Sequence, residues 1–315
     1  MPKLRPDQYL SCVLFLIVSF FVPISSPIEA KELKPITKLQ PLPLLAENFK
    51  YPVKKTELVP APRLTAKAAI VYDVTNGAII FDKSVDEQLP EASLTKLMTA
   101  LVSIDLYSLD DQVTINHDEF TTENNVMGLR PNEVITVGNL LKGLLIFSAN
   151  DAALALSNHH PQGSEAFIAA MNTKAKELHL EHTSFQNSPG FDDQNHHSTA
   201  FDLAILAKEV LSHPQLSDIM QTQTTTVTDV TETIDHPLHS TNLLLNKLSG
   251  VIAGKTGSTP LAGECLITEV VREEHPIITV VLGSQDRFND TSILVDWVYN
   301  YFEWRPPVQT DITTQ

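Results

Sequence analysis

The sequence has 315 residues, of which 43% are apolar and 19% are charged, so its composition is that of one large or two small globular domains. Its 22 Lys and Arg residues are outnumbered by 38 Asp and Glu residues, which gives a formal net charge of −16. A surface of this sign repels nucleic acid, so a role in binding polyanions is disfavoured.

The N-terminus predicts export from the cytoplasm. Lys3 and Arg5 precede a nearly uninterrupted apolar run at residues 9–24, and a polar, proline-containing segment follows this run. This order is typical of a signal peptide or of an uncleaved membrane anchor, so we assign that role to residues 1–30. Cleavage after Ala30 stays open, because Ile28 stands where signal peptidases usually require a small residue.

A proline-rich segment follows at residues 31–64. Its density of proline predicts an extended tether with little packing of its own. We expect the folded domain to cover residues 65–305 and residues 306–315 to form a tail. The prolines of the predicted tether are Pro35, Pro41, Pro43, Pro52, Pro60 and Pro62.

The folded domain is expected to begin with a hairpin and to continue with helices. Two β-rich runs within residues 68–83 flank Asn76-Gly77, which is the strongest short hairpin signal. Ser164 is the predicted N-cap of one helix, and Thr199 and Asp202 resemble a capping box at the start of another. Apolar residues at helical spacing predict helices over residues 93–107, 136–147, 151–160, 164–180 and 199–213.

The pattern returns to strands toward the C-terminus. A β-branched run covers residues 224–230, a hairpin is predicted over residues 263–271 and 276–283, and a helix over residues 290–302 closes the domain. Strands at both ends with helices between them predict an α/β fold. We expect one antiparallel sheet, built from the N-terminal hairpin and the C-terminal strands, with helices packed on it and an inserted helical lobe.

The first candidate motif is Ser93-Leu94-Thr95-Lys96, at the start of a predicted helix. Residues three apart share a helix face, so the hydroxyl of Ser93 and the amine of Lys96 can meet. An ordinary lysine is neutral in only about 0.04% of molecules at pH 7, so Lys96 needs burial and a nearby cation to act as a base. The motif alone carries little information, because about one match is expected by chance in a chain of this length.

The second candidate motif is Ser148-Ala149-Asn150, which interrupts two apolar predicted helices. A hydroxyl there can relay a proton, and an amide can hold a substrate carbonyl or N–H group. Ser240-Thr241-Asn242 has the same spacing but lies in an irregular polar stretch, so we favour the motif at Ser148.

The third candidate motif is Lys255-Thr256-Gly257-Ser258, just before a strand-like run. An edge there can pair with an extended peptide, and Gly257 lets a ligand approach the backbone. Lys255 can bind a terminal carboxylate and can serve as the second cation that lowers the pKa of Lys96. A phosphate-binding loop is excluded, because only three residues separate Gly250 from Gly254 and a strand follows.

The ordered set of these three motifs resembles the penicillin-recognising serine D-Ala-D-Ala peptidases, and specifically their low-molecular-mass carboxypeptidases. The likeness extends over about residues 65–303 and includes the segments "LPEASLTKLMTALV", "FQNSPGFDDQNHHSTAFDLAILAKEVL" and "GKTGSTPLAGECLI". It implies the β-lactamase/transpeptidase-like fold. It also implies a substrate, the peptidoglycan stem peptide, whose terminal D-Ala is removed during cell-wall synthesis and remodelling.

The resemblance implies a role for each motif residue. Ser93 is the implied acyl-ester nucleophile, Lys96 its general base and Ser148 a proton relay. The implied substrate-binding residues are Asn150, Lys255, Thr256, Gly257 and Ser258, with the backbone N–H groups of Ser93 and Ser258 as the oxyanion hole. Arg287 matches an arginine near the family's closing helix and is a weaker candidate for substrate binding.

The same resemblance implies covalent inhibition by β-lactams, no metal or other cofactor, and an extracytoplasmic location. Ser258 departs from the family, whose members often carry an aromatic residue or His there. The chain ends about 58 residues after the third motif. We therefore expect no C-terminal β-domain or membrane helix and assign any membrane contact to the N-terminal segment.

Four alternatives stay open. D,D-endopeptidase action on cross-links uses the same chemistry, and a non-catalytic penicillin sensor uses the same fold. A class A β-lactamase needs a Glu-x-x-x-Asn stretch, which residues 182–193 lack. A zinc peptidase is disfavoured, because the sequence contains no His-Glu-x-x-His motif and its histidines are expected to be solvated. The chain also has only two cysteines, Cys12 and Cys265, which is too few for a metal site built from cysteines.

Overall fold

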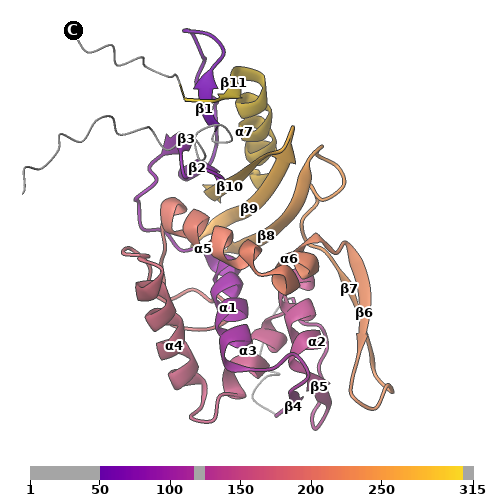
Figure 1. Ribbon diagram of the computed structural model, residues 1–315. Coiled ribbons are helices and arrows are strands. Elements are labelled where there is room, and N and C mark those ends of the chain that lie inside the picture. Colours follow the sequence, from indigo (N-terminus) through magenta and orange to yellow (C-terminus); the bar gives the residue numbers. More distant parts are fainter. Residues whose placement is uncertain (1–49, 117–124, 308–315) are drawn as a thin grey trace, which may run out of the picture. The chain divides into compact units, whose positions relative to one another are not determined.

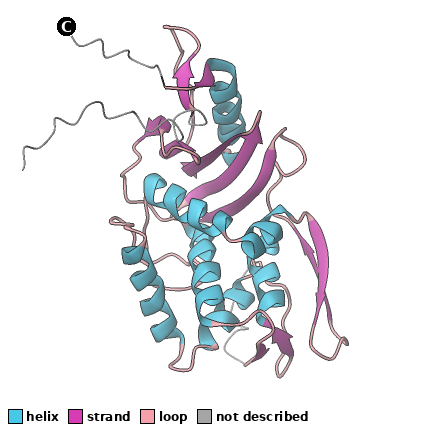
Figure 2. Ribbon diagram, viewed as in Figure 1, coloured by secondary structure: helices cyan, strands magenta, loops and turns pink. Residues whose placement is uncertain are grey.

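The computed structural model describes residues 50–116 and 125–307. Its centre is a five-stranded antiparallel sheet in the order β3-β2-β10-β9-β8, which confirms the predicted α/β fold and the pairing of N-terminal with C-terminal strands (Figures 1 and 2). The strands span Ala68–Asp73 (β2), Ile79–Lys83 (β3), Val251–Thr259 (β8), Gly263–Arg272 (β9) and His275–Ser284 (β10).

Both predicted hairpins form within this sheet. In the β2–β3 turn, Asp73 accepts the backbone N–H groups of Thr75 and Asn76, and Gly77 adopts a φ of +78°. This positive φ is readily adopted only by glycine, which explains the Asn-Gly signal. The β9–β10 hairpin turns at Glu273 and Glu274.

Helices cover both faces of the sheet. Helix α7 (Arg287–Tyr301) packs on β9 and β10 around one apolar cluster, while α5 (Ala200–Ser212) packs on β10 and β2 around the larger cluster. All six residues of β2 are buried, as expected for a strand covered on both sides. The sheet is therefore a rigid platform, and its edge strand β8 remains available along one side.

The helical lobe lies on the α5 side of the sheet (Figure 1). Helix α1 runs through it and contacts α3, α4 and α5. Two short sheets, β4–β5 and β6–β7, border the lobe, so the predicted strand at 224–230 pairs in a separate hairpin rather than in the central sheet. The elements are α1 (Lys96–Leu106), β4 (Gln112–Thr114), β5 (Val134–Thr136), α2 (Val137–Lys142), α3 (Asn150–Asn158), α4 (Ser164–Glu177), α6 (Pro214–Gln221), β6 (Thr224–Thr228) and β7 (Asp235–His239).

The two predicted helix caps have different outcomes. The side chain of Thr199 accepts the backbone N–H of Asp202, as predicted for the start of α5. The carboxylate of Asp202 accepts instead from the N–H of His182, so the capping box is not reciprocal. Ser164 is wrong as the N-cap of α4: the cap residue is Gly163, with a φ of +82°, and no side chain caps the helix.

The last part of the predicted tether is ordered, contrary to the expectation of little packing. Strand β1 (Tyr51–Lys54) pairs with β11 (Phe302–Arg305) in an antiparallel ladder. The indole N–H of Trp297 donates to the carbonyl oxygen of Pro60 over 2.6 Å. Pro52 does not prevent this pairing, because an edge strand tolerates a residue without an N–H group.

Several predictions lie outside the described residues. They are the export segment at 1–30, the tether at 31–49 and the tail beyond residue 307, and these stay predictions. Among the described helices, none has both the length and the apolar character needed to cross a bilayer.

Candidate active site

The first motif forms a tight turn at the start of α1, which we call the nucleophile turn (Glu91–Lys96). A 3₁₀ helix, η1 (Ala92–Thr95), runs directly into α1. Ala92 adopts a φ of +52°, a conformation that costs about 1 kcal/mol or more for a residue with a side chain. The turn leaves Ser93 partly exposed to solvent and buries Lys96 completely.

The amine of Lys96 makes three polar contacts. It lies 2.9 Å from Ser93 Oγ, 2.7 Å from Asn150 Oδ1 and 2.6 Å from the carbonyl oxygen of Pro189. The last two oxygens can only accept hydrogen bonds. In a neutral amine, which has two hydrogens, both are donated to these oxygens, so the lone pair is directed at the hydroxyl of Ser93.

Burial makes the neutral amine accessible near pH 7. It lowers the pKa of Lys96 to about 7, while the carboxylate of Asp151 opposes this shift. Desolvation disfavours a charged ammonium, which is the physical cause. A base with this pKa is largely neutral in mildly alkaline solution.

We therefore expect acylation of Ser93 to depend on pH through Lys96. Its rate should rise about tenfold per pH unit below the pKa of about 7 and level off above it, because only the neutral amine can take the proton. Timed labelling with a fluorescent penicillin between pH 5 and pH 9 measures this profile. A rate that is flat across this range would contradict the assignment of Lys96 as the base.

The second motif follows an irregular helical turn. A π-helical turn, η3 (Gly143–Phe147), ends at Ser148, which adopts the left-handed conformation with a φ of +64°. The N–H of Ala149 then donates back to the carbonyl oxygen of Gly143, and α3 begins at Asn150. Turns of this kind concentrate at functional sites, because they redirect side chains out of the helix. Here the buried hydroxyl of Ser148 points at the amine of Lys255, 2.6 Å away.

The third motif lies on the edge strand β8, as the sequence predicts, although the strand begins before the motif. Gly257 lies against the nucleophile turn, where a Cβ atom would be 2.9 Å from the carbonyl oxygen of Glu91 and 3.1 Å from the backbone nitrogen of Ser93. Glycine is thus required for the strand to approach Ser93 this closely. Ser258, the next residue, is exposed.

Arg287 joins the site from the start of α7. Its Nη1 donates to the carbonyl oxygen of Gly257 over 2.7 Å, and its backbone N–H donates to the carboxylate of Glu264. Its Nε is buried and has no hydrogen-bond partner among the described residues. The guanidinium therefore borders β8 directly beside the third motif.

Lys255 is as buried as Lys96, which changes the predicted electrostatics. Burial is the largest cause that lowers the pKa of Lys255 well below its usual value, and repulsion from Lys96 and Arg287 lowers it further. The sequence predicts burial and repulsion from Lys255 together as causes of the shift at Lys96. Burial is the largest cause that lowers the pKa of both amines, and the charge of Lys96 also lowers the pKa of Lys255.

Three residues contribute to the site although the sequence did not identify them: Thr241, Pro189 and Asp151. Thr241 belongs to the rejected Ser-x-Asn tripeptide, yet its hydroxyl lies 2.6 Å from the hydroxyl of Thr256. The carbonyl oxygen of Pro189 is an acceptor that any residue type could supply. The carboxylate of Asp151 accepts the N–H groups of Met127 and Gly128 and so fixes the loop before the second motif.

Two histidines, His196 and His236, are buried rather than solvated. The prediction of a solvated side chain is therefore wrong for His196, and the burial of His236 was not predicted. His196 lies 2.8 Å from Glu91 Oε1, and His236 lies 2.6 Å from Glu133 Oε1. Within residues 50–116 and 125–307, no group of His, Cys, Asp and Glu side chains could hold a metal ion. Cys265 is a buried free thiol.

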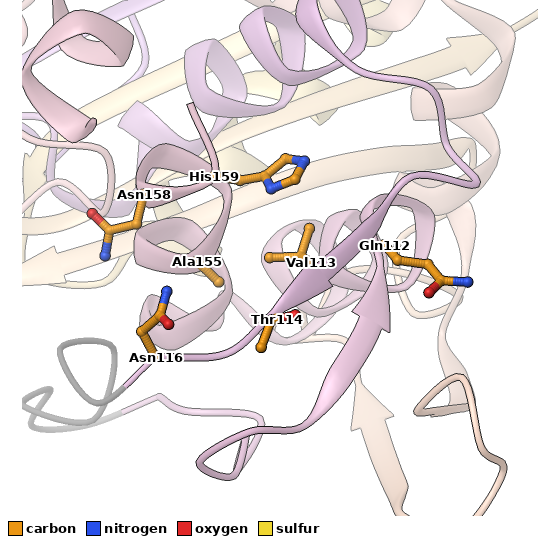
Figure 3. Close-up of a pocket in the computed structure, with 7 residues that line it drawn as sticks. All are labelled: Gln112, Val113, Thr114, Asn116, Ala155, Asn158 and His159. Carbon is orange, nitrogen blue, oxygen red and sulfur yellow. The ribbon is translucent and has the colours of Figure 1, made fainter. Parts of the chain in front are cut away.

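A separate polar hollow of about 280 Å³ lies between β4 and α3 (Figure 3). None of the three motifs contributes a residue to it. Its lining includes Gln112, Thr114, Asn116, Asn158 and His159.

A family model described as D-alanyl-D-alanine carboxypeptidase, peptidase S11, matches residues 55–286. The chain is 34% identical over 272 residues to the D-alanyl-D-alanine carboxypeptidase DacC of Escherichia coli K12, covering 82% of this chain and 67% of that protein. It is 31% identical over 249 residues to DacF of Bacillus subtilis, another D-alanyl-D-alanine carboxypeptidase, covering 76% of this chain and 64% of that protein. The chain thus spans about two thirds of the length of these relatives.

Other comparisons extend this similarity. The chain is 32% identical to the D-alanyl-D-alanine endopeptidase of Escherichia coli K12, covering 75% of this chain and 78% of that protein. The crystal structure of a D-alanyl-D-alanine carboxypeptidase from Mycobacterium tuberculosis H37Rv superposes with a TM-score of 0.73 and 26% identity, covering 79% of this chain and 96% of that one.

Proposed function

Because the chain belongs to the peptidase S11 family of D-alanyl-D-alanine carboxypeptidases, we propose that it removes the terminal D-Ala from peptidoglycan stem peptides through an acyl-enzyme on Ser93. One observation carries this proposal. The buried amine of Lys96 lies 2.9 Å from the hydroxyl of Ser93. Two oxygens that can only accept take its two hydrogens, so it is positioned as a general base.

The first half of the reaction forms an ester. Lys96 takes the proton of Ser93, and Oγ attacks the carbonyl carbon of the D-Ala-D-Ala peptide bond. The backbone N–H groups of Ser93 and Ser258 stabilise the oxyanion. The C–N bond then breaks. Ser148, 2.6 Å from Lys255, gives its hydroxyl proton to the departing amine of D-Ala and takes in its place the proton that Lys96 received from Ser93, so that the amine of Lys96 is neutral again.

The second half releases the shortened peptide. A water molecule gives a proton to the neutral amine of Lys96 and attacks the ester carbonyl, after which the C–O bond breaks and Ser93 regains its proton. The same steps with the strained amide of penicillin leave a slowly hydrolysed ester on Ser93, which is the basis of inhibition by β-lactams.

Edge strand β8 supplies the substrate-binding surface of the proposal. An extended stem peptide can pair with its free edge, as peptides do when they add to a sheet. Arg287 provides positive charge for the terminal carboxylate, Lys255 and Thr256 provide further hydrogen-bond donors for it, and Asn150 orients the peptide. We assign this enzyme to the cell-wall side of the membrane, with residues 1–30 as the export segment and residues 31–49 as the tether.

Endopeptidase action on cross-links is the second candidate, favoured by the similarity to the Escherichia coli endopeptidase. The chemistry on Ser93 is identical, but the departing amine then belongs to a second stem peptide. Release of D-Ala from a pentapeptide, against release of monomers from a cross-linked dimer, distinguishes the two.

The test is to incubate the purified protein with a fluorescent penicillin and with diacetyl-Lys-D-Ala-D-Ala. We expect stoichiometric labelling, with the label mapped by mass spectrometry to the peptide that contains Ser93, together with release of D-Ala. A label on another residue, or activity abolished by a metal chelator, would refute the serine mechanism. Labelling without D-Ala release would favour a sensor, and rapid penicillin turnover a β-lactamase.

A further inference from the structure

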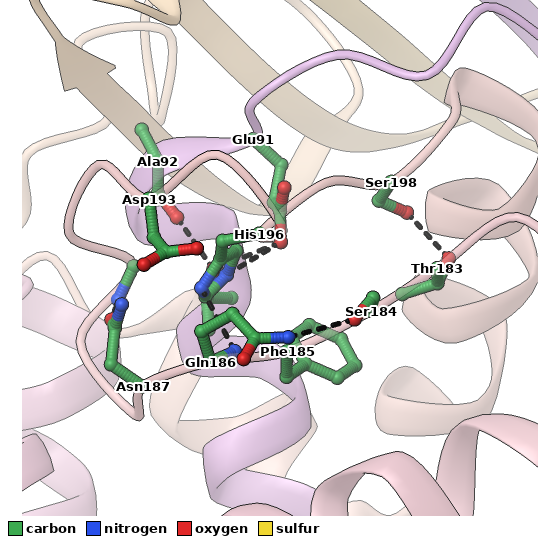
Figure 4. A network of polar contacts seen from close by, with 12 residues as sticks. Glu91, Ala92, Thr183, Ser184, Phe185, Gln186, Asn187, Asp193, His196 and Ser198 are labelled. Carbon is green, nitrogen blue, oxygen red and sulfur yellow. Dashed lines mark hydrogen bonds and ion pairs between the residues drawn. The ribbon is translucent and has the colours of Figure 1, made fainter.

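A buried histidine–carboxylate pair lies directly behind the nucleophile turn (Figure 4). The Nε2 atom of His196 is 2.8 Å from Glu91 Oε1 and 2.9 Å from the hydroxyl of Thr95. The side chains of His196 and Glu91 are only 3% and 0% exposed. Glu91 stands two residues before Ser93 and Thr95 one residue before Lys96, so His196 holds the turn at both ends.

The hydrogen bonds define the form of the imidazole. The backbone N–H of Gln186 donates to Nδ1 of His196 over 3.2 Å, so Nδ1 carries no proton. The proton of a neutral ring is then on Nε2, where it is donated to the carboxylate of Glu91. The ring therefore bridges two segments, accepting from Gln186 on one side and donating to Glu91 on the other.

Gln186 belongs to a closed loop, residues 184–198, which we call the lysine-facing loop. Its two ends pair through a β-bridge between Ser184 and His197, and Ser198 pairs with Leu89 just before the nucleophile turn. Within the loop, Asn187 Oδ1 accepts the N–H groups of Gly190 and Phe191. This shape places the carbonyl oxygen of Pro189 against the amine of Lys96.

We propose that Glu91 and His196 are positioning residues whose hydrogen bond fixes the lysine-facing loop against the nucleophile turn. Through this bond they hold the Pro189 carbonyl oxygen on the amine of Lys96 and keep water away from that amine. Neither residue is given a role in the three motifs. The proposal rests on the proposed function, because it assigns the pair to the activation of the same Ser93.

Stability alone does not account for this pair. A buried polar pair often contributes little net stability compared with apolar residues of the same size. The second oxygen of Glu91, Oε2, is buried without a hydrogen-bond partner among the described residues, which is a further cost. Such a pair is best explained by the geometry that it enforces, and here that geometry includes the base.

Loosening the lysine-facing loop is expected to raise the pKa of Lys96. The charged groups that face this amine are the carboxylate of Asp151 and the amine of Lys255, and neither lies on the loop. If the loop moves away, water reaches Lys96 and reduces the desolvation that lowers its pKa. The pKa then rises, and a higher pH is needed to reach the neutral, active form.

The experiment measures acylation by fluorescent penicillin against pH in the wild type, His196→Phe and Glu91→Gln. His196→Phe keeps an aromatic ring in place but removes the hydrogen bonds to Glu91, Thr95 and Gln186. We expect acylation about 10- to 100-fold slower at pH 7, because small displacements of a base have effects of this size. We also expect the acid limb of the profile to move to higher pH. Glu91→Gln keeps an acceptor for Nε2 and should retain most of the rate.

The matched control is His236→Phe. His236 is 1% exposed and its Nε2 lies 2.6 Å from Glu133 Oε1, but its Nδ1 donates to the carbonyl oxygen of Met127 and it does not touch the lysine-facing loop. This variant should lose stability while its acid limb stays in place. All rates are measured below the melting temperature of each variant. If His196→Phe does not fold, Glu91→Leu removes the same hydrogen bond from the other side.

The outcomes separate the two proposals. A wild-type rate and an unmoved acid limb in His196→Phe would overturn the positioning role. Equal shifts in His196→Phe and His236→Phe would overturn it as well, since the effect would then be general loosening. A wild-type protein that takes no label would refute the proposed function and the positioning role with it.

Discussion

Replacing Lys96 by methionine is expected to slow the acylation of Ser93 by about 10⁴-fold, the upper range for loss of a general base. Methionine has nearly the same length as lysine and lacks the lone pair directed at the Ser93 hydroxyl, 2.9 Å away. It also carries no charge into the buried position, so the fold should survive. The measurement is the time course of covalent penicillin labelling, read by intact mass.

Lys142→Met is the control for this substitution. The amine of Lys142 donates to Asn139 Oδ1 on helix α2 and contacts none of the three motifs. This variant should label at the wild-type rate. Labelling of Lys96→Met within about tenfold of the wild type would show that another group activates Ser93, since a real base contributes at least about 10²-fold.

Gly190→Ala is expected to lower acylation by about 10²-fold and to reduce the melting temperature. Gly190 follows Pro189 in the lysine-facing loop and has a φ of +85°. A Cβ atom there would lie 2.0 Å from the carbonyl oxygen of Ala92, a distance that no real contact reaches. Either the loop or the nucleophile turn must move, and both carry groups that contact Lys96. Labelling rates and thermal unfolding together report the effect.

Gly163→Ala is the control that measures the cost of a positive φ alone, without a steric clash. Gly163 has a φ of +82°, but a Cβ atom there would meet nothing within 4 Å. Its substitution should cost about 1 kcal/mol of stability and leave acylation unchanged. If Gly190→Ala behaves like Gly163→Ala, the close approach of the loop to Ala92 is not needed for activity.

The sequence was sufficient for the parts of the fold that follow local patterns. The Asn76-Gly77 hairpin, the apolar spacing of α1 and the β9–β10 hairpin depend on residues within a few positions of one another. The three motifs were recognisable because each needs particular side chains at fixed spacing. Their meeting was predicted from a family resemblance, and the structure brings Lys96 to Ser93 and Lys255 to Ser148.

The remaining contacts join segments far apart in the chain through groups that leave no pattern. Pro189 contributes a backbone carbonyl, which every residue has. Thr241 reaches Thr256 from a tripeptide that looked like a polar loop. His196 stands among charged and polar neighbours, so nothing local indicates that Glu91, about a hundred positions earlier, removes it from solvent.

The β1–β11 ladder has a mechanical consequence. Its four residue pairs, from Tyr51 with Arg305 to Lys54 with Phe302, tie the first described strand to the last one. A force applied to the chain at residue 50 therefore acts on the hydrogen bonds of this ladder before it acts on β2 and the central sheet. If the protein is attached at its N-terminus, the ladder can open under tension and absorb the force while Ser93 and Lys96 keep their separation.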